Sequence, residues 1–328
     1  MIYLVTGGAG FIGSHLCEKL LIAGSRVLAV DNLSTGSFQN IAHLKPHPDF
    51  SFYVGDIREA QLMEQLVQKT RIVIHLAAAV GVKHILHNPV ETLESNVTGT
   101  TRVLALSATY NRRTIIASTS EVYGKSAKEI FSEDDDLVLG PSYKKRWGYA
   151  CSKLLDEFLA LAYFEQKGLP VTIARLFNTV GPRQTGRYGM VLPTFVGQAV
   201  RQEPITVFGT GQQSRCFSHV EEVVEAIMML VGNQESHGQI INLGNNHPIT
   251  ITELARLVKE ITNSSSEILT IPYNQAYEEG FEDMNHRIPD ISKAQKLIGF
   301  KPHKSVADII RDILAWMTDE KKTRLGYF

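Results

Sequence analysis

The first half of the chain alternates short β-branched runs with longer amphipathic segments, and this alternation constrains the fold more than any other feature. In a strand–helix–strand unit, the helix crosses over between two parallel strands. We therefore predict an α/β fold, a Rossmann-type doubly wound parallel sheet. The predicted strands are 2–6, 26–31, 50–54, 72–77, 114–118 and 171–177, and the predicted helices are 12–23, 60–69, 90–110 and 147–167.

The alternation stops after residue 177, where segments rich in Gly and Pro separate shorter predicted helices at 192–202, 221–231 and 252–263. We expect two lobes. The first covers residues 1–178, completed by parts of 212–245, and carries the sheet. The smaller C-terminal lobe covers mainly 179–328 and is expected to bind the substrate.

Composition excludes several classes of protein. The 328 residues carry a formal net charge of -1 without a basic face, which argues against nucleic-acid binding. No apolar run approaches the roughly 18 residues that span a bilayer, and Met1 leads directly into a strand pattern without a cleavable leader, so we expect a cytoplasmic protein outside the membrane. The three cysteines have no CxxC spacing and the histidines have no ligand spacing, so no metal site is predicted.

A glycine-rich turn follows the first predicted strand and opens a helix. Gly7, Gly10 and Gly13 suit a tight turn that approaches a pyrophosphate, and the helix N-terminus offers free N–H groups. Asp31 ends the second strand, where an acid accepts hydrogen bonds from the adenosine ribose and repels a 2′-phosphate. We therefore predict NAD as the cofactor of residues 1–178. The predicted cofactor-binding residues are Gly7, Gly10, Phe11, Ile12, Gly13, Asp31, Asn32, Asp56, Ile57, Leu76, Ala77, Ala78, Tyr149 and Lys153.

Two Tyr-x-x-x-Lys patterns lie on one predicted helix, and position separates them. Tyr149 and Lys153 begin the helix, near the carboxyl ends of the strands where ligands of such sheets bind. Tyr163 lies roughly 20 Å further along the helix, and we expect it to have a packing role. The Lys153 ammonium is expected to lower the pKa of Tyr149, so that the phenolate can take a proton from a carbinol. Thr119 can hydrogen-bond the same hydroxyl group.

With these motifs, the chain resembles the extended short-chain dehydrogenase/reductase family of NAD-dependent sugar-nucleotide epimerases, dehydratases and decarboxylases. Segments 96–100, 175–183, 209–215 and 289–294 extend the resemblance along the chain. The resemblance implies a UDP-sugar substrate whose diphosphate is held by Asn178 and Arg215. It also implies that Leu192, Val207 and Phe208 border the uracil.

The segment 117–124 bears on which reaction is carried out. The family's 4,6-dehydratases have an Asp where this chain has Ser120, and simple 4-epimerases usually lack the acid found here as Glu121. Glu121, the Arg146-Trp147 pair and an Arg-x-Pro-x-Ile pattern at Arg287 resemble UDP-glucuronate decarboxylases, including UDP-xylose synthase. The resemblance implies catalytic roles for Thr119, Tyr149, Lys153, Glu121 and Arg287.

Several alternatives stay open at this point. A 4-epimerase acting on UDP-glucose or UDP-glucuronate needs only Thr119, Tyr149 and Lys153. Glu121 can also be a partly buried acid bonded to the backbone, and Arg287 can also be a phosphate ligand. A catalytically idle NAD-binding regulator is a further alternative, against which the intact catalytic residues argue. The apolar residues on more than one face of 90–110 and 147–167, together with the resemblance, imply a homodimer built on these helices.

Overall fold

The predicted parallel sheet is present and has seven strands. A computed structural model of the chain describes residues 1–81, 85, 87–186, 189–276, 284 and 287–319. All neighbouring strands of the main sheet are parallel, in the order β12-β7-β5-β4-β1-β2-β3. The strands are β1 (Ile2–Thr6), β2 (Arg26–Asp31), β3 (Phe50–Val54), β4 (Ile72–His75), β5 (Arg113–Thr119), β7 (Val171–Leu176) and β12 (Gln239–Leu243).

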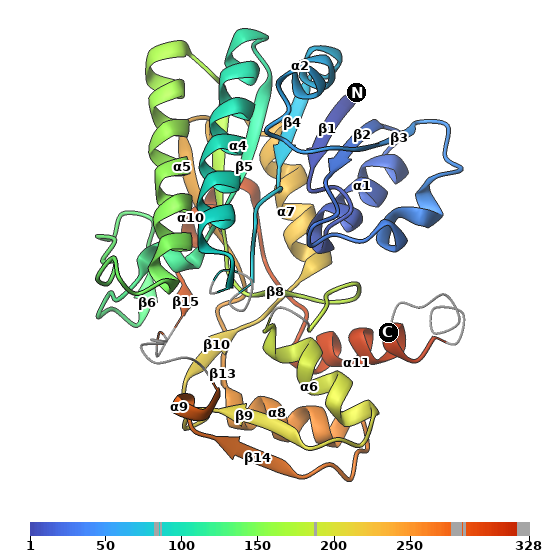
Figure 1. Cartoon of the computed structure of the whole chain (residues 1–328), viewed down its shortest axis with the longest axis vertical. Helices are drawn as coiled ribbons and strands as arrows, with labels where there is room; N and C mark the ends of the chain where they lie inside the picture. The colour runs from blue at the N-terminus through green and yellow to red at the C-terminus, as the bar shows by residue number, and fades with distance from the viewer. Residues whose placement is uncertain (82–84, 86, 187–188, 277–283, 285–286, 320–328) are drawn as a thin grey trace.

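Helices cover both faces of this sheet (Figure 1). One layer holds α2 (Ala60–Lys69), α4 (Pro89–Thr109) and α5 (Arg146–Lys167), and the other holds α1 (Phe11–Ile22), α7 (Val220–Gly232) and α10 (Ser292–Ile298). The sequence accounts for where these helices start and stop. Pro89 stands at the beginning of α4, where its missing N–H costs nothing, and Gly168 ends α5 in the left-handed conformation.

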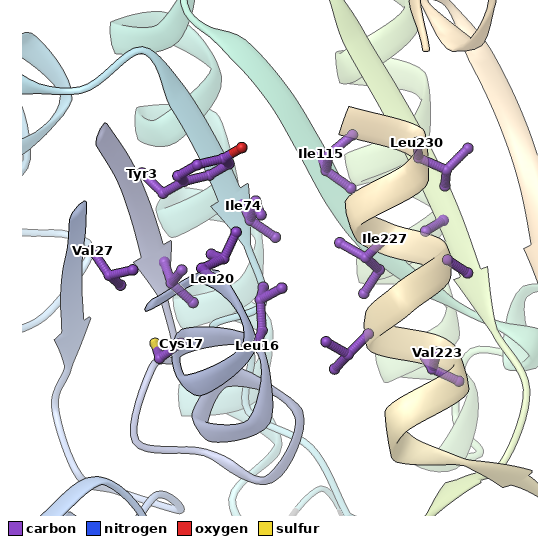
Figure 2. Close-up of a cluster of buried hydrophobic side chains, with 14 of the residues drawn as sticks. Tyr3, Leu16, Cys17, Leu20, Val27, Ile74, Ile115, Val223, Ile227 and Leu230 are labelled. Carbon is purple, nitrogen blue, oxygen red and sulfur yellow. The ribbon is translucent and has the colours of Figure 1, made fainter. Parts of the chain in front are cut away.

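A hydrophobic core lies between one face of the sheet and the layer that contains α1 and α7. Figure 2 shows Leu16 and Leu20 of α1 beside sheet residues of β1 and β4, while Ile227 of α7 lies beside Ile115 of β5. These side chains are almost completely buried. Helices α1 and α7 each pack an apolar stripe against the sheet. The carboxyl ends of the strands are therefore held in fixed positions relative to one another.

The seventh strand, β12, was not among the predicted strands. Its residues Gln239 and Asn242 are polar, so the run is too short and too interrupted to stand out as a buried strand. It pairs in parallel with β7, and Asn242 lies opposite Arg175. Both α7 and β12 fall within residues 212–245 and belong to the sheet and its covering layer.

The smaller lobe has a core of its own. Its helices are α6 (Val191–Val200), α8 (Ile251–Ile261) and α11 (Val306–Met317), which pack with the parallel pair β9 (Ile205–Phe208) and β14 (Ile268–Ile271). Short strand pairs link the two lobes and line their junction. They are β8 (Thr179–Val180) with β11 (Ser218–His219), β10 (Ser214–Cys216) with β13 (Pro248–Thr250), and β6 (Ile130–Phe131) with β15 (Ile288–Pro289).

The described residues also form four short helical segments. They are η1 (Phe38–Leu44), η2 (Ser120–Tyr123), η3 (Gln234–Ser236) and α9 (Tyr273–Ala276). Within the part of the chain that the structure describes, every helix is too short or too polar to cross a bilayer.

Candidate active site

The glycine-rich turn lies where the strand order of the sheet reverses, between β1 and β4. Ligands of open α/β sheets bind in the crevice at this point. Gly7 has a φ of +70°, and a Cβ there would lie 2.8 Å from the backbone nitrogen of Ala77. A Cβ on Gly13 would lie 2.1 Å from the carbonyl oxygen of Gly7. Side chains are therefore excluded, and the backbone is open to close approach by a phosphate group.

The surroundings of the turn fit a dinucleotide. Gly10 is the N-cap residue of α1 and provides no capping side chain, and the first turn of the helix holds no acidic residue, so its N–H groups suit an anion. The Asp31 carboxylate is buried and accepts hydrogen bonds from the backbone N–H groups of Ala9 (3.0 Å) and Leu33 (2.8 Å). Because a carboxylate has about four acceptor positions, Asp31 keeps capacity for the ribose hydroxyls of NAD.

The other predicted cofactor residues lie at neighbouring strand ends. Asn32 donates to the Asp56 carboxylate (3.1 Å). Hydrogen bonds from Arg58 lower the pKa of Asp56 to about 2, so this acid is ionised. The N–H of Ala77 donates to the Thr6 hydroxyl (3.2 Å), which joins the ends of β1 and β4. Four residues share the same edge: Phe11 and Ile12 begin α1, and Leu76 and Ala78 follow β4. Ile57 is buried against Gly99 of α4.

Thr119 and Tyr149 come together from two elements. Thr119 ends β5 and caps η2, where its hydroxyl accepts a hydrogen bond from the Glu121 N–H (3.2 Å). Tyr149 lies in the first turn of α5 and hydrogen-bonds Thr119, a contact that acts to lower the pKa of the phenol. Tyr163 packs among apolar side chains at the far end of the helix, which confirms its predicted packing role.

The predicted lowering of the Tyr149 pKa by Lys153 stays a prediction. The buried Lys153 ammonium donates to the Asp156 carboxylate at 2.7 Å. Burial, followed by the negative charges of Glu121 and Asp156, raises the pKa of Tyr149 above its usual value. Asp156 was not singled out from the sequence, because an acid at i+3 from a lysine on a helix is ordinarily a surface pair. Here the pair is buried.

Glu121 lies between two arginines from distant parts of the chain. The Arg287 guanidinium donates to its Oε1 (3.3 Å), and the Arg146 guanidinium lies 3.7 Å from the same oxygen. Arg146 begins α5, Glu121 belongs to η2, and Arg287 precedes β15. Both arginine side chains are buried, and the carboxylate is mostly buried. The Arg-x-Pro-x-Ile pattern singled out Arg287, whose catalytic role stays a prediction, whereas the sequence assigned no role to Arg146.

The predicted substrate-binding residues fall into two groups. Asn178 has a φ of +26° and donates to the carbonyl of Cys216 (3.1 Å), next to the buried Arg215, so both candidate phosphate ligands lie together. Leu192 and Val207 are buried in the core of the lobe, and Phe208 at the end of β9 is half-buried.

Of the histidines considered in the sequence, His75 is buried and His87 is exposed. His75 is buried between the hydroxyls of Thr6 (2.7 Å) and Thr100 (3.0 Å), and burial lowers its pKa to about 3. His84 and His286 lie outside the described residues. Among the residues that are described, no three acidic, histidine or cysteine side chains form a group that could hold a metal ion.

Comparison with known proteins extends over nearly the whole chain. A family model described as GDP-mannose 4,6 dehydratase matches residues 4–313. A UDP-N-acetyl-alpha-D-glucosaminuronate decarboxylase of Bacillus cytotoxicus is 39% identical over 96% of this chain and 97% of its own length. UDP-glucuronic acid decarboxylase 1 of Arabidopsis thaliana is 36% identical over 98% of this chain and 70% of its own length.

Among solved structures, the UDP-glucuronic acid 4-epimerase of Bacillus cereus in complex with UDP-glucuronic acid and NAD is similar in fold. It superposes with a TM-score of 0.87 at 27% identity, over 97% of this chain and 99% of that one.

Proposed function

The chain belongs to the GDP-mannose 4,6 dehydratase family, within the extended short-chain dehydrogenases/reductases, and we propose that it is an NAD-dependent UDP-glucuronate decarboxylase. The product is UDP-xylose or its 4-keto intermediate. The observation that carries the proposal is the contact of Glu121 with Arg287 and Arg146, beside the Thr119–Tyr149 pair. The decarboxylases of Bacillus cytotoxicus and Arabidopsis thaliana support it.

Oxidation at C4 is the step that all candidate reactions share. Thr119 and Tyr149 form a hydrogen-bonded pair that can hold the C4 hydroxyl, and the phenolate of Tyr149 takes its proton. When bound at the glycine turn, NAD supplies hydride acceptance and return at C4. The turn, Asp31 and the strand ends around Ala77 hold the cofactor in this proposal, and Asn178 and Arg215 hold the diphosphate of the sugar nucleotide.

The charges at Glu121 favour a substrate that carries a carboxylate. Two buried guanidinium groups, those of Arg146 and Arg287, lie at one oxygen of the Glu121 carboxylate, where solvent is scarce. Guanidinium groups bind carboxylates well, so a carboxylate at C6 of the sugar would accept hydrogen bonds from these arginines. Once C4 is a ketone, the C5–C6 bond of the β-keto acid can break, because its electron pair passes into the C4 carbonyl and carbon dioxide leaves. A proton is then added at C5.

Similarity to the 4-epimerase of Bacillus cereus supports a second candidate function. A 4-epimerase acting on UDP-glucuronate would use the same C4 oxidation, would return the hydride to the opposite face, and would keep the carboxylate. Glu121 and its two arginines favour the decarboxylase, because C4 inversion alone requires no group beside C6.

One incubation separates the two candidate functions. The purified protein is given NAD and UDP-glucuronate, and carbon dioxide and nucleotide sugars are measured together. We expect carbon dioxide and a UDP-pentose. UDP-galacturonate without carbon dioxide, at every enzyme concentration tried, would establish the epimerase. A parallel incubation uses UDP-N-acetylglucosaminuronate, the sugar named for the Bacillus cytotoxicus relative. Carbon dioxide from that sugar alone would assign the chain to the 2-acetamido substrate.

We also propose that the protein acts in the cytoplasm as a homodimer. The dimer is expected to form on the exposed faces of α4 and α5.

A further inference from the structure

The side chain of Asn242, on the seventh strand, joins three separate segments in the interior. It is completely buried. Its Oδ1 accepts a hydrogen bond from the Tyr123 hydroxyl (2.8 Å), and its Nδ2 donates to the carbonyls of Phe131 (2.9 Å) and Asp290 (3.3 Å). Both amide donors are therefore used, and a side chain of another type could not replace all three bonds.

The three segments are those that place Glu121 and Arg287. Tyr123 ends η2, the short helix that contains Glu121. Asp290 follows β15, which begins directly after Arg287, and its N–H donates to the Phe131 carbonyl (2.8 Å). Strand β15 pairs in parallel with β6, so Phe131 lies opposite Pro289. Asn242 is thus the common attachment point of the two chain segments that carry the ion pair.

The attachment point is itself rigidly held. Strand β12 is fixed to β7 by the parallel ladder, and the Asn242 N–H donates to the Glu133 carboxylate (2.8 Å). The Tyr123 ring stacks on Phe131 with centroids 4.7 Å apart, and the Arg175 guanidinium lies 4.8 Å from the Tyr123 ring centroid. Arg175 is buried and paired with Glu157 of α5 at 2.7 Å. A buried, well-packed network of this kind transmits small displacements to its neighbours.

We propose that Asn242 is a positioning residue that sets the Glu121–Arg287 pair for decarboxylation. This inference rests on the proposed function. In that step the C5–C6 bond breaks, its electron pair passes into the C4 carbonyl, carbon dioxide leaves and C5 receives a proton. The C4 oxidation is carried by Thr119 of β5 and Tyr149 of α5, whereas the hydrogen bonds of the Asn242 side chain go to Tyr123, Phe131 and Asp290. The two steps should therefore respond differently when Asn242 is changed.

The test is the substitution Asn242→Asp, which keeps the shape of the side chain. A carboxyl group donates at most one hydrogen bond, so at least one of the Phe131 and Asp290 carbonyls loses its donor. The measured quantity is carbon dioxide released per NAD reduced, from single-turnover absorbance and gas release with UDP-glucuronate. We expect this ratio to fall about 10- to 100-fold, since misplacement by about 1 Å costs on the order of 100-fold. NAD reduction should stay within about threefold of the wild type.

A second variant removes the hydrogen bond between Tyr123 and Asn242. Tyr123→Phe removes the hydroxyl that reaches Asn242 and keeps the ring that stacks on Phe131. It should lower the same ratio, and it tests the proposal if Asn242→Asp does not fold. Asn233→Asp is the matched control, because Asn233 also joins two segments, through Leu297 and Glu235, at the far end of α7. Its ratio should equal that of the wild type.

Each outcome either supports or overturns the positioning role of Asn242. A low ratio in both network variants, with the control unchanged, supports the positioning role. An equal loss of NAD reduction and of carbon dioxide, or an unchanged ratio in both variants, overturns it and leaves Asn242 a structural residue. If the wild type reduces NAD but releases no carbon dioxide, the proposed function itself has failed, and the inference about this step fails with it.

Discussion

At the scale of single residues, Tyr149 is the group on which every candidate reaction depends. Replacing it by Phe removes the phenol that hydrogen-bonds Thr119 and leaves no acceptor for the C4 proton. We expect the Tyr149→Phe variant to lose about 100- to 10,000-fold in kcat, the range for positioned acid–base groups. Steady-state turnover of UDP-glucuronate measures it.

Tyr163→Phe is the matched control, since the same atom is removed from the same helix at the second Tyr-x-x-x-Lys match. Tyr163 is partly buried against the apolar core, and its variant should turn over at about the wild-type rate. If both variants keep full activity, the assignment of the catalytic tyrosine is wrong.

The charge of Asp156 is expected to shift the pH dependence of activity, because it acts on the pKa of Tyr149. Tyr149 must be deprotonated to accept a proton, so activity rises as pH approaches its pKa from below. The charge of Asp156 is one of the causes that raise this pKa. The substitution Asp156→Asn removes that charge and leaves the Lys153 ammonium without its anion, and both changes favour the phenolate. The rising limb of the kcat profile should therefore move to lower pH.

The other groups around Asp156 leave the direction of this shift unchanged. On α5 they are Lys153 and Glu157, on α4 it is Thr100, and His75 of β4 is kept neutral by burial. A limb that stays in place, or moves to higher pH, would show that Lys153 and Asp156 do not act on Tyr149. Circular dichroism at each pH separates this result from unfolding.

Substitutions of Glu121 and Arg287 test the decarboxylation step of the proposed mechanism. Glu121→Gln keeps the shape of the side chain and removes its charge, while Thr119 and Tyr149 stay in place. A decarboxylase should lose about 100-fold or more in carbon dioxide release, the effect of one positioned acid–base group, and much less in C4 oxidation. Arg287→Ala should behave in the same way if it holds the carboxylate, whereas loss of a phosphate ligand would chiefly raise KM. Product analysis with both variants decides between these roles.

At the scale of elements, the turn between β1 and α1 leaves no room for a side chain. A methyl group on Gly13 would meet the Gly7 carbonyl oxygen at 2.1 Å, and that oxygen cannot move freely because it belongs to the backbone. Gly13→Ala should destabilise the protein by about 1–3 kcal/mol, the usual cost of overpacking, and weaken NAD binding. Urea unfolding and NAD titration measure the two effects.

Gly232→Ala provides the control for that substitution. Gly232 ends α7, and a methyl group there meets nothing within 4 Å. Its affinity for NAD should equal that of the wild type. If Gly13→Ala binds NAD equally well, the cofactor does not lie against this turn.

Much of the sheet could be predicted from the sequence because its inner strands are continuous β-branched runs. The limits of β1, β2 and β3 agree with the predicted ranges, and in β1 and β2 burial on both faces allows few polar residues. Strand β12 escaped prediction because Asn242 places a polar side chain in its interior. The reason for that residue lies in segments about 50 to 120 positions away along the chain, and no local pattern records such a contact.

The candidate site was predictable to a similar degree and for a similar reason. Gly13, Tyr149 and Arg287 belong to local patterns, so their positions could be found. The Lys153–Asp156 pair could not, because the sequence does not show that this face of α5 is completely buried. The contact of Arg146 with Glu121 also depends on the meeting of two segments that are separate in the chain.

At the scale of the whole molecule, the layer formed by α4 and α5 has an outer face that the fold leaves uncovered. Both helices run side by side along one side of the sheet (Figure 1). Large apolar side chains are exposed on them, notably Val90 (67%), Leu93 (40%), Leu155 (42%) and Phe158 (64%). A helix pair that presents such a face to water is a candidate for pairing with a second copy through a two-fold axis.

We therefore expect a homodimer in which α4 and α5 of each protomer form a four-helix contact. The substitution Phe158→Asp places a charge where Phe158 would be buried between protomers, and an unpaired buried charge is costly. Sedimentation at micromolar concentration should give a dimer for the wild type and a monomer for the variant. Ile22→Asp introduces the same charge at a side chain that is 78% exposed on α1, in the opposite helix layer, and should remain dimeric. A wild-type chain that sediments as a monomer would contradict the prediction, and dissociation by both variants would place the contact elsewhere.

Because α5 also carries Tyr149 in its first turn, the activity of a folded Phe158→Asp monomer would further show whether pairing at the outer face of the helix is needed to hold the catalytic end in place.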